Sequence, residues 1–191
     1  MRPHTCGVFY LIYFFLLFKN YLYICVMNIF FLDYDTQKCA KYHCDKHVVK
    51  MILETAQLLC GVHWVAGSEA PYKLSHKNHP CSIWARKSLS NYLYLCDLGL
   101  ELCKEYTFRY GKKHKTQQII EWCLINKPNI NDIDFTTPPK AMPDEFKVDC
   151  VIESYRNYYR VAKASFATWK NRVIPDWFEN KNIIYNPLLT Y

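Results

Sequence analysis

Glycine is scarce in this chain, with only 5 among 191 residues, and no segment repeats another. The scarcity excludes collagen-like and glycine-rich low-complexity chains. Charged residues are also few, at 21% of the chain against 51% hydrophobic residues. That balance excludes an intrinsically disordered protein, because so many apolar side chains can be buried in a core. The length predicts one folded domain.

The ten cysteines form no CxxC pair, so the spacing typical of a structural zinc site is missing. Six of them fall in segments expected to be helical or close to them: Cys44, Cys60, Cys96, Cys103, Cys123 and Cys150. We therefore expect buried, reduced thiols, as in proteins of the cytoplasm or nucleus.

The first 26 residues differ from the rest. Residues 8–18 are all apolar or aromatic, Lys19 and Asn20 interrupt the run, and residues 21–26 are apolar again. No small-residue cleavage site follows, which argues against a signal peptide. Two interpretations remain. Either translation starts at Met27 and residues 1–26 are no part of the protein, or residues 8–26 form a single membrane-spanning anchor.

Residues 27–178 are predicted to form a mainly α domain with one short strand at its start, followed by a tail at 179–191. The strand is expected at residues 28–32, and helices are expected over 36–60, 80–110, 116–125 and 148–169. Pro80 suits the first position of its helix, and Gly111 suits the residue after the end. Four prolines in residues 127–147 exclude a continuous helix there.

The helix expected over residues 36–60 carries the sharpest functional pattern. At 100° per residue, one polar strip gathers His43, Lys46, His47, Lys50, Glu54 and Gln57. Two histidines at i, i+4 can share a metal ion, although the lysines beside them oppose a cation. The same lysines favour phosphate, next to a histidine that can act as acid or base. A solvated helix face with a Lys50–Glu54 ion pair is the alternative.

The opposite side of this helix is expected to face the core, with Val48 and Val49 among its apolar residues. Asp45 falls on that side, where a carboxylate needs a partner such as Arg86 or a backbone amide. A buried carboxylate of this kind is either structural or orients a catalytic histidine.

Basic residues gather at two further places. His76 and His79 precede the helix that starts at Pro80, where free backbone amides favour anions, and His79 can equally cap the helix. The last helix carries a basic stripe of Arg156, Arg160 and Lys163 beside tyrosines. Cations next to aromatic rings suit single strands and extruded nucleotides, although an ordinary amphipathic helix shows the same pattern.

Four segments carry a family resemblance: MNIFFLD at 27–33, YHCDKHVVKM at 42–51, HPCSIWAR at 79–86 and SYRNYY at 154–159. They resemble a family of small proteins from phages and large DNA viruses for which no activity is settled. The resemblance covers about residues 27–178. It implies a viral protein in the host cytoplasm or nucleus, or in a host membrane if residues 8–26 are translated, and it favours a start at Met27.

These patterns favour an enzyme acting on nucleic acid or a nucleotide. In this hypothesis the catalytic candidates are His43, Asp45, His47 and Glu54. The candidates for binding phosphate are Lys46, Lys50, His76, His79, Arg86, Arg156 and Arg160. A divalent metal on His43 and His47 would make the protein a metal-dependent hydrolase. A nucleic-acid-binding protein without activity and a single-pass membrane protein are the alternatives.

Overall fold

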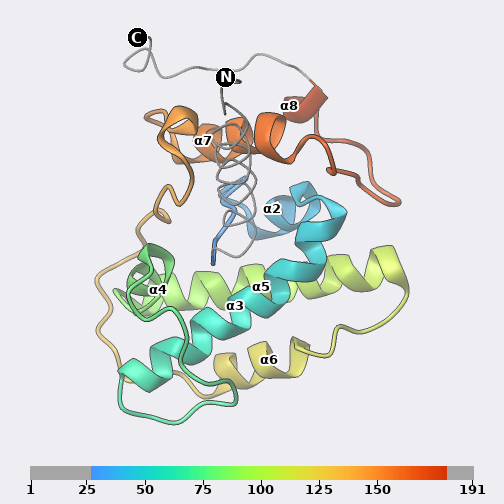
Figure 1. Cartoon of the computed structure of the whole chain (residues 1–191). Helices are drawn as coiled ribbons and strands as arrows, with labels where there is room; N and C mark the ends of the chain where they lie inside the picture. Colours follow the sequence, from blue (N-terminus) through green and yellow to red (C-terminus); the bar gives the residue numbers. More distant parts are fainter. Residues whose placement is uncertain (1–26, 180–191) are drawn as a thin grey trace, which may run out of the picture.

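The computed structural model describes residues 27–179, so the expectations for residues 1–26 and for the tail lie outside the described residues. The helices are α2 (Thr36–Tyr42), α3 (Asp45–Val65), α4 (Pro80–Ala85), α5 (Leu89–Tyr110), α6 (Gln117–Ile125), α7 (Val151–Tyr158) and α8 (Asp176–Glu179). A 3₁₀ turn spans Asp144–Phe146, and a π turn at Tyr159–Lys163 continues α7. The domain is mainly α, as predicted (Figure 1).

Helix α5 is the one around which its neighbours pack. It contacts α2, α3, α4 and α6, and α3 crosses it at the centre of the domain (Figure 1). Gly99 permits this close approach, because a Cβ there would lie 2.7 Å from Thr55 Cγ2 and 3.0 Å from Ile120 Cδ1. The helix ends as predicted at Gly111, which has a φ of 68°.

The first of the two long helices predicted from the sequence is broken. It stops at Tyr42, and His43 and Cys44 have extended backbone before α3 begins. The break turns the His43 side chain inward, where its Nδ1–H donates to the Cys39 carbonyl at 2.7 Å. The predicted polar strip assumed one unbroken helix, so its placement of His43 on that strip is wrong.

The second long helix is broken as well, between Ala85 and Leu89. Ser88 there has extended backbone, and its hydroxyl donates to Asp132 Oδ1 at 2.7 Å. This contact attaches the proline-containing segment 127–147, which is irregular as predicted, to the start of α5. The last predicted helix is shorter than expected, since α7 passes into the π turn after Tyr158.

Residues 28–32 are buried in the core, but they do not form the expected strand. Side chains satisfy part of this backbone: the Asn28 amide donates to Glu54, and the Leu32 carbonyl accepts from Arg156. A strand needs a second extended backbone to pair with. The described part of the chain contains no strand that could serve.

Helix α3 is long and apolar enough to span a membrane, with a mean hydropathy of 1.3 in its most apolar window, yet 61% of that window is buried inside the domain. It packs against α4, α5 and α6, which makes it a core helix.

Five of the six cysteines expected to be buried are buried thiols, and only Cys150 is exposed. Val49, expected to face the core, is 40% exposed.

Candidate active site

A cavity of about 560 Å³ opens beside the first half of α3. Residues far apart in sequence line it, and those with polar or aromatic side chains are Asn28, Phe30, Lys46, His47, Lys50, Glu54, His79, Lys140, Lys147, Tyr158, Lys163 and Phe166. Five of these are lysines, and one is a carboxylate. The cavity is therefore a positively charged site with aromatic walls, the combination that suits a nucleotide.

Glu54 is the carboxylate of the cavity and is only 7% exposed. Its Oε2 accepts from the Asn28 backbone amide at 3.0 Å, and its Oε1 pairs with Lys50 Nζ at 2.9 Å. The Lys50–Glu54 ion pair was predicted, but it lies at the cavity wall rather than on a solvated helix face. The two contacts fix the orientation of the carboxylate.

His47 is the second polar group at the cavity wall and is 6% exposed. Its Nδ1 lies 2.5 Å from the Tyr159 hydroxyl, and its ring stacks on Phe30 at 4.3 Å. Burial, helped by the charges of neighbouring basic groups, lowers the pKa of His47 well below its usual value. The imidazole is therefore neutral at pH 7 and held by its Nδ1, which leaves Nε2 for a ligand.

Apart from Lys50, which pairs with Glu54, the lysines of the cavity fall into two groups. Lys46 Nζ lies 4.8 Å from the centre of the Phe166 ring, and Lys163 Nζ lies 4.3 Å from that of Tyr158. Burial and the nearby Lys50 lower the pKa of Lys163. By contrast, Lys140 bonds to the Val148 and Asp149 carbonyls and Lys147 pairs with Asp144, so these two lysines hold the loop that forms one wall.

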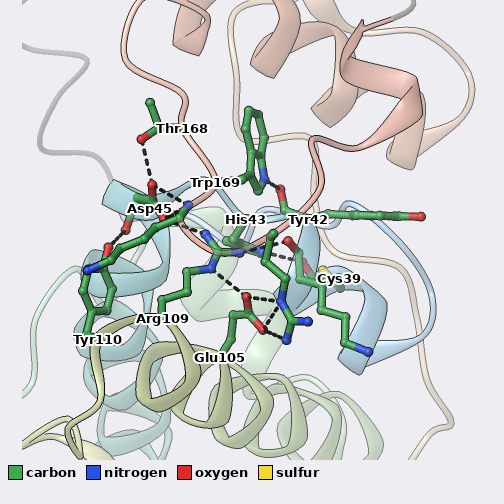
Figure 2. A network of polar contacts seen from close by, with 12 residues as sticks. Cys39, Tyr42, His43, Asp45, Glu105, Arg109, Tyr110, Thr168 and Trp169 are labelled. Atoms are coloured by element: carbon green, nitrogen blue, oxygen red, sulfur yellow. Dashed lines mark hydrogen bonds and ion pairs between the residues drawn. The ribbon is translucent and has the colours of Figure 1, made fainter.

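Asp45 is not part of the cavity but of a separate polar network (Figure 2). It pairs with Arg109 at 2.9 Å rather than with Arg86, and it accepts from the Thr168 hydroxyl at 2.8 Å and the Lys170 amide at 3.0 Å. Asp45 thus joins the start of α3 to the segment after the π turn. Its contacts give it a structural role rather than that of orienting a histidine.

Arg109 is the centre of this network and is fully buried (Figure 2). Its Nε donates to Glu105 at 2.6 Å, and its Nη2 donates to the Lys41 carbonyl at 3.0 Å. Glu105 also binds Arg172 at 2.8 Å. Burial would raise the pKa of Glu105, but the two arginines outweigh it and lower the pKa. Each charge in the network is thereby paired.

The three arginines that were predicted to bind phosphate also have partners within the protein. Arg86 donates to the Lys77 carbonyl at 2.6 Å. Arg156 donates to the Leu32 carbonyl at 3.0 Å, and Arg160 donates to the Trp177 carbonyl at 2.6 Å. The last two therefore hold the buried segment 28–32 and the C-terminal segment in place, and none of the three lines the cavity.

The two predicted histidines near α4 separate. His79 lines the cavity and caps α4, where its Nδ1 accepts from the Cys81 amide at 3.2 Å. His76 is outside the cavity, in a left-handed backbone conformation with a φ of 50°. The cavity thus brings together Lys46, His47, Lys50, Glu54 and His79 from the residues predicted as site candidates.

The predicted metal site is not formed by the histidine pair. His43 and His47 use their Nδ1 atoms for different partners, Cys39 and Tyr159. Within residues 27–179 there is no group of three or more histidine, cysteine, aspartate or glutamate side chains that could hold a metal ion.

Several cavity residues were missed by sequence reasoning, namely Asn28, Phe30, Lys140, Lys147, Tyr158 and Phe166. They come from segments that only the folded chain brings beside α3. Lys163 was noticed in the basic stripe, which is the one signal that pointed to this wall.

A family model described as pyrimidine dimer DNA glycosylase matches residues 27–118. The matched range contains α2 to α5 and, with them, the cavity residues Lys46, His47 and Glu54. No curated protein and no solved structure matches the chain. The match is to enzymes that act on DNA, in agreement with the enzyme acting on nucleic acid that the sequence favours.

Proposed function

We propose that the chain is a DNA glycosylase that breaks the bond between one base of a pyrimidine dimer and its sugar, with the cavity as its active site. The departing base stays joined to its partner base in the dimer. The observation that carries this proposal is Glu54, the one carboxylate among the described residues of a cavity whose lining includes five lysines and several aromatic rings. Cleavage of the bond between base and sugar builds positive charge on the sugar, and a carboxylate beside that charge stabilises it. Water then bonds to C1′ of the sugar, and its proton balances the charge on the departing base. The family match over residues 27–118 supports the substrate class.

The remaining groups of the cavity suit the rest of the nucleotide. Lys46 and Lys163 supply charge for the phosphates. The rings of Tyr158 and Phe166, against which these lysines lie, offer surfaces on which an extruded base can stack.

His47 is the group we assign to the departing base. If the Tyr159 hydroxyl donates to Nδ1, the proton of the neutral ring is on Nε2. From there it can donate a hydrogen bond to a carbonyl oxygen of the base as the glycosidic bond breaks. The lowered pKa keeps the ring neutral, so it adds no charge next to the developing cation.

Because Asn28 contacts Glu54, the start at Met27 expected from the sequence would change which chemical group lies beside this carboxylate. In the printed chain the nitrogen of residue 28 is a peptide amide, 3.0 Å from Glu54 Oε2. A chain that started at Met27 and lost that residue would carry a primary amine at this place. An amine beside a carboxylate can form a Schiff base with the sugar, which would add strand cleavage to base release.

The test uses a duplex oligonucleotide with one pyrimidine dimer under single-turnover conditions. Base release, which here means breakage of the base–sugar bond, is measured as alkali-sensitive abasic sites. Glu54→Gln keeps the size of the side chain but loses its charge, so we expect a rate about 10²–10³-fold lower. Glu121→Gln, on a partly exposed carboxylate outside the cavity, is the matched control and should keep full activity.

Two outcomes would contradict the proposal: full activity of Glu54→Gln, and salt-dependent DNA binding by the unaltered chain without base release. The second outcome would instead support a DNA-binding protein without activity. Borohydride reduction during the reaction tests the amine separately. A covalent protein–DNA product is expected for a chain that begins at Asn28 and not for the printed chain.

A further inference from the structure

Two apolar side chains on α3 are exposed close in sequence to cavity lysines, although neither lines the cavity itself. Leu53 is 41% exposed and Val49 is 40% exposed, although they belong to a core helix. They lie one turn apart, and each follows a cavity lysine by three residues: Val49 follows Lys46, and Leu53 follows Lys50. Residues three apart are neighbours on a helix surface, so an apolar ridge runs along the lysine row.

The position of Leu53 relative to the catalytic candidate follows from helix geometry. At 100° per residue it lies about 60° around the helix axis from Lys50 and about 100° from Glu54. It is therefore on the solvent side of the cavity wall, one residue before the carboxylate. A nucleotide that enters the cavity beside Glu54 would therefore keep the rest of its DNA strand close to Leu53.

A base that enters the cavity leaves a gap in the stack of its duplex. Apolar side chains inserted between base steps fill such gaps in proteins that distort DNA, and nearby cations hold the phosphates on either side. The row of Lys46, Val49, Lys50 and Leu53 offers both kinds of group side by side. Because lysines lie beside the apolar ridge, we expect it to contact DNA, which is negatively charged, rather than an apolar protein surface.

We propose that Leu53, backed by Val49, inserts into the base stack when a nucleotide is drawn into the cavity. This inference rests on the proposed function, since it assigns the ridge to the same DNA. It names a residue that acts on the duplex and not on the reacting bond. Leu53 therefore affects extrusion of the nucleotide and leaves the chemical step unchanged.

The experiment compares the full chain with Leu53→Ala, Val49→Ala and the matched control Ile125→Ala, an 80% exposed residue at the end of α6. A 2-aminopurine beside the dimer reports unstacking by fluorescence, and base release is measured on the same duplex. We expect Leu53→Ala to lose most of the fluorescence rise and to release the base about tenfold more slowly. On a duplex in which the damaged nucleotides are already unpaired, its deficit should shrink to about twofold.

The readouts separate the two proposals. A fluorescence rise that depends on Leu53 without any base release keeps the wedge and overturns the glycosylase. Base release with equal fluorescence for Leu53→Ala and the unaltered chain overturns the wedge alone. A change in molecular mass in solution for Leu53→Ala, with unchanged fluorescence, assigns the ridge to self-association and also overturns the wedge.

Discussion

Asp45 and Lys46 are neighbours in the sequence, but they belong to two polar clusters of opposite character. Asp45 joins a network in which Arg109, Glu105 and Arg172 pair with one another inside the protein. Lys46 faces a cavity and lies against an aromatic ring. Charges paired within the protein serve the fold, whereas an excess of one sign around an open space is suited to a ligand of the other sign.

The two histidines of the α2–α3 region repeat this contrast. His43 is buried behind the helix break and bonds to a backbone carbonyl, while His47 is anchored at one ring nitrogen at the cavity wall. Burial lowers the pKa of both rings, so an altered pKa does not by itself separate the functional histidine from the structural one. The cavity separates the two histidines, because His47 lines it and His43 does not.

The largest effect should come from opening the closed network. Arg109→Met leaves the buried carboxylate of Glu105 and the partly buried one of Asp45 without their shared partner, and we expect a loss of about 3–5 kcal/mol in the free energy of unfolding. Urea titration followed by circular dichroism measures it. Base release per folded molecule should stay close to that of the unaltered chain.

The matched control is Arg86→Met, which removes one hydrogen bond to a backbone carbonyl at the surface and should cost about 1 kcal/mol or less. Equal losses for the two variants would show that the network does not hold the fold. A stable Arg109→Met variant without base release would place the network in the active site and would remove the contrast drawn above.

A smaller effect is expected from acid, and it concerns His43. Burial lowers its pKa to about 4, whereas the unfolded chain has a histidine pKa near 6.5. Between these values the unfolded chain binds a proton that the folded chain does not, so stability falls as the pH drops from about 6.5 to 4. The loss is about 1.4 kcal/mol per pH unit for this group, and His47 adds to it in the same direction.

The variant His43→Gln tests this assignment, because glutamine cannot take up the proton. Its free energy of unfolding should be lower than that of the unaltered chain at pH 7 but should fall less steeply toward pH 5, by about 1.4 kcal/mol per unit. Urea titrations at several pH values measure both slopes. An unchanged slope would mean that the pKa of His43 is the same in the folded and the unfolded chain.

The sequence predicted the fold class and one wall of the cavity for a physical reason. Lys46, His47, Lys50 and Glu54 share one helix, so helical periodicity alone brings them together. It could not reveal the break before α3, because the break depends on the burial of His43 against Cys39. It also could not pair Asp45 with Arg109, since that contact joins residues 64 apart.

The rest of the cavity depends on long-range packing. The loop held by Lys140 and the π turn that carries Lys163 reach α3 only in the folded chain. Val49 was assigned to the core because it is apolar, and exposure of such a residue cannot be inferred from its type. An exposed apolar residue close to the cavity departs from the usual rule that apolar residues face the core, and contact with a ligand is the reason we give for it.

The smallest effect should separate the two clusters by salt. Lys46→Ala removes one charge from the cavity, so the slope of log affinity against log salt for duplex DNA should fall by about 0.9, with an affinity loss of about tenfold or less at low salt. Lys113→Ala, which removes a lysine paired with Glu121 outside the cavity, should leave that slope unchanged. Fluorescence anisotropy at several salt concentrations measures both. Because Lys46 carries no part of the closed network, its loss should leave the free energy of unfolding within about 0.5 kcal/mol, and equal slopes for the two variants would place the DNA elsewhere on the molecule.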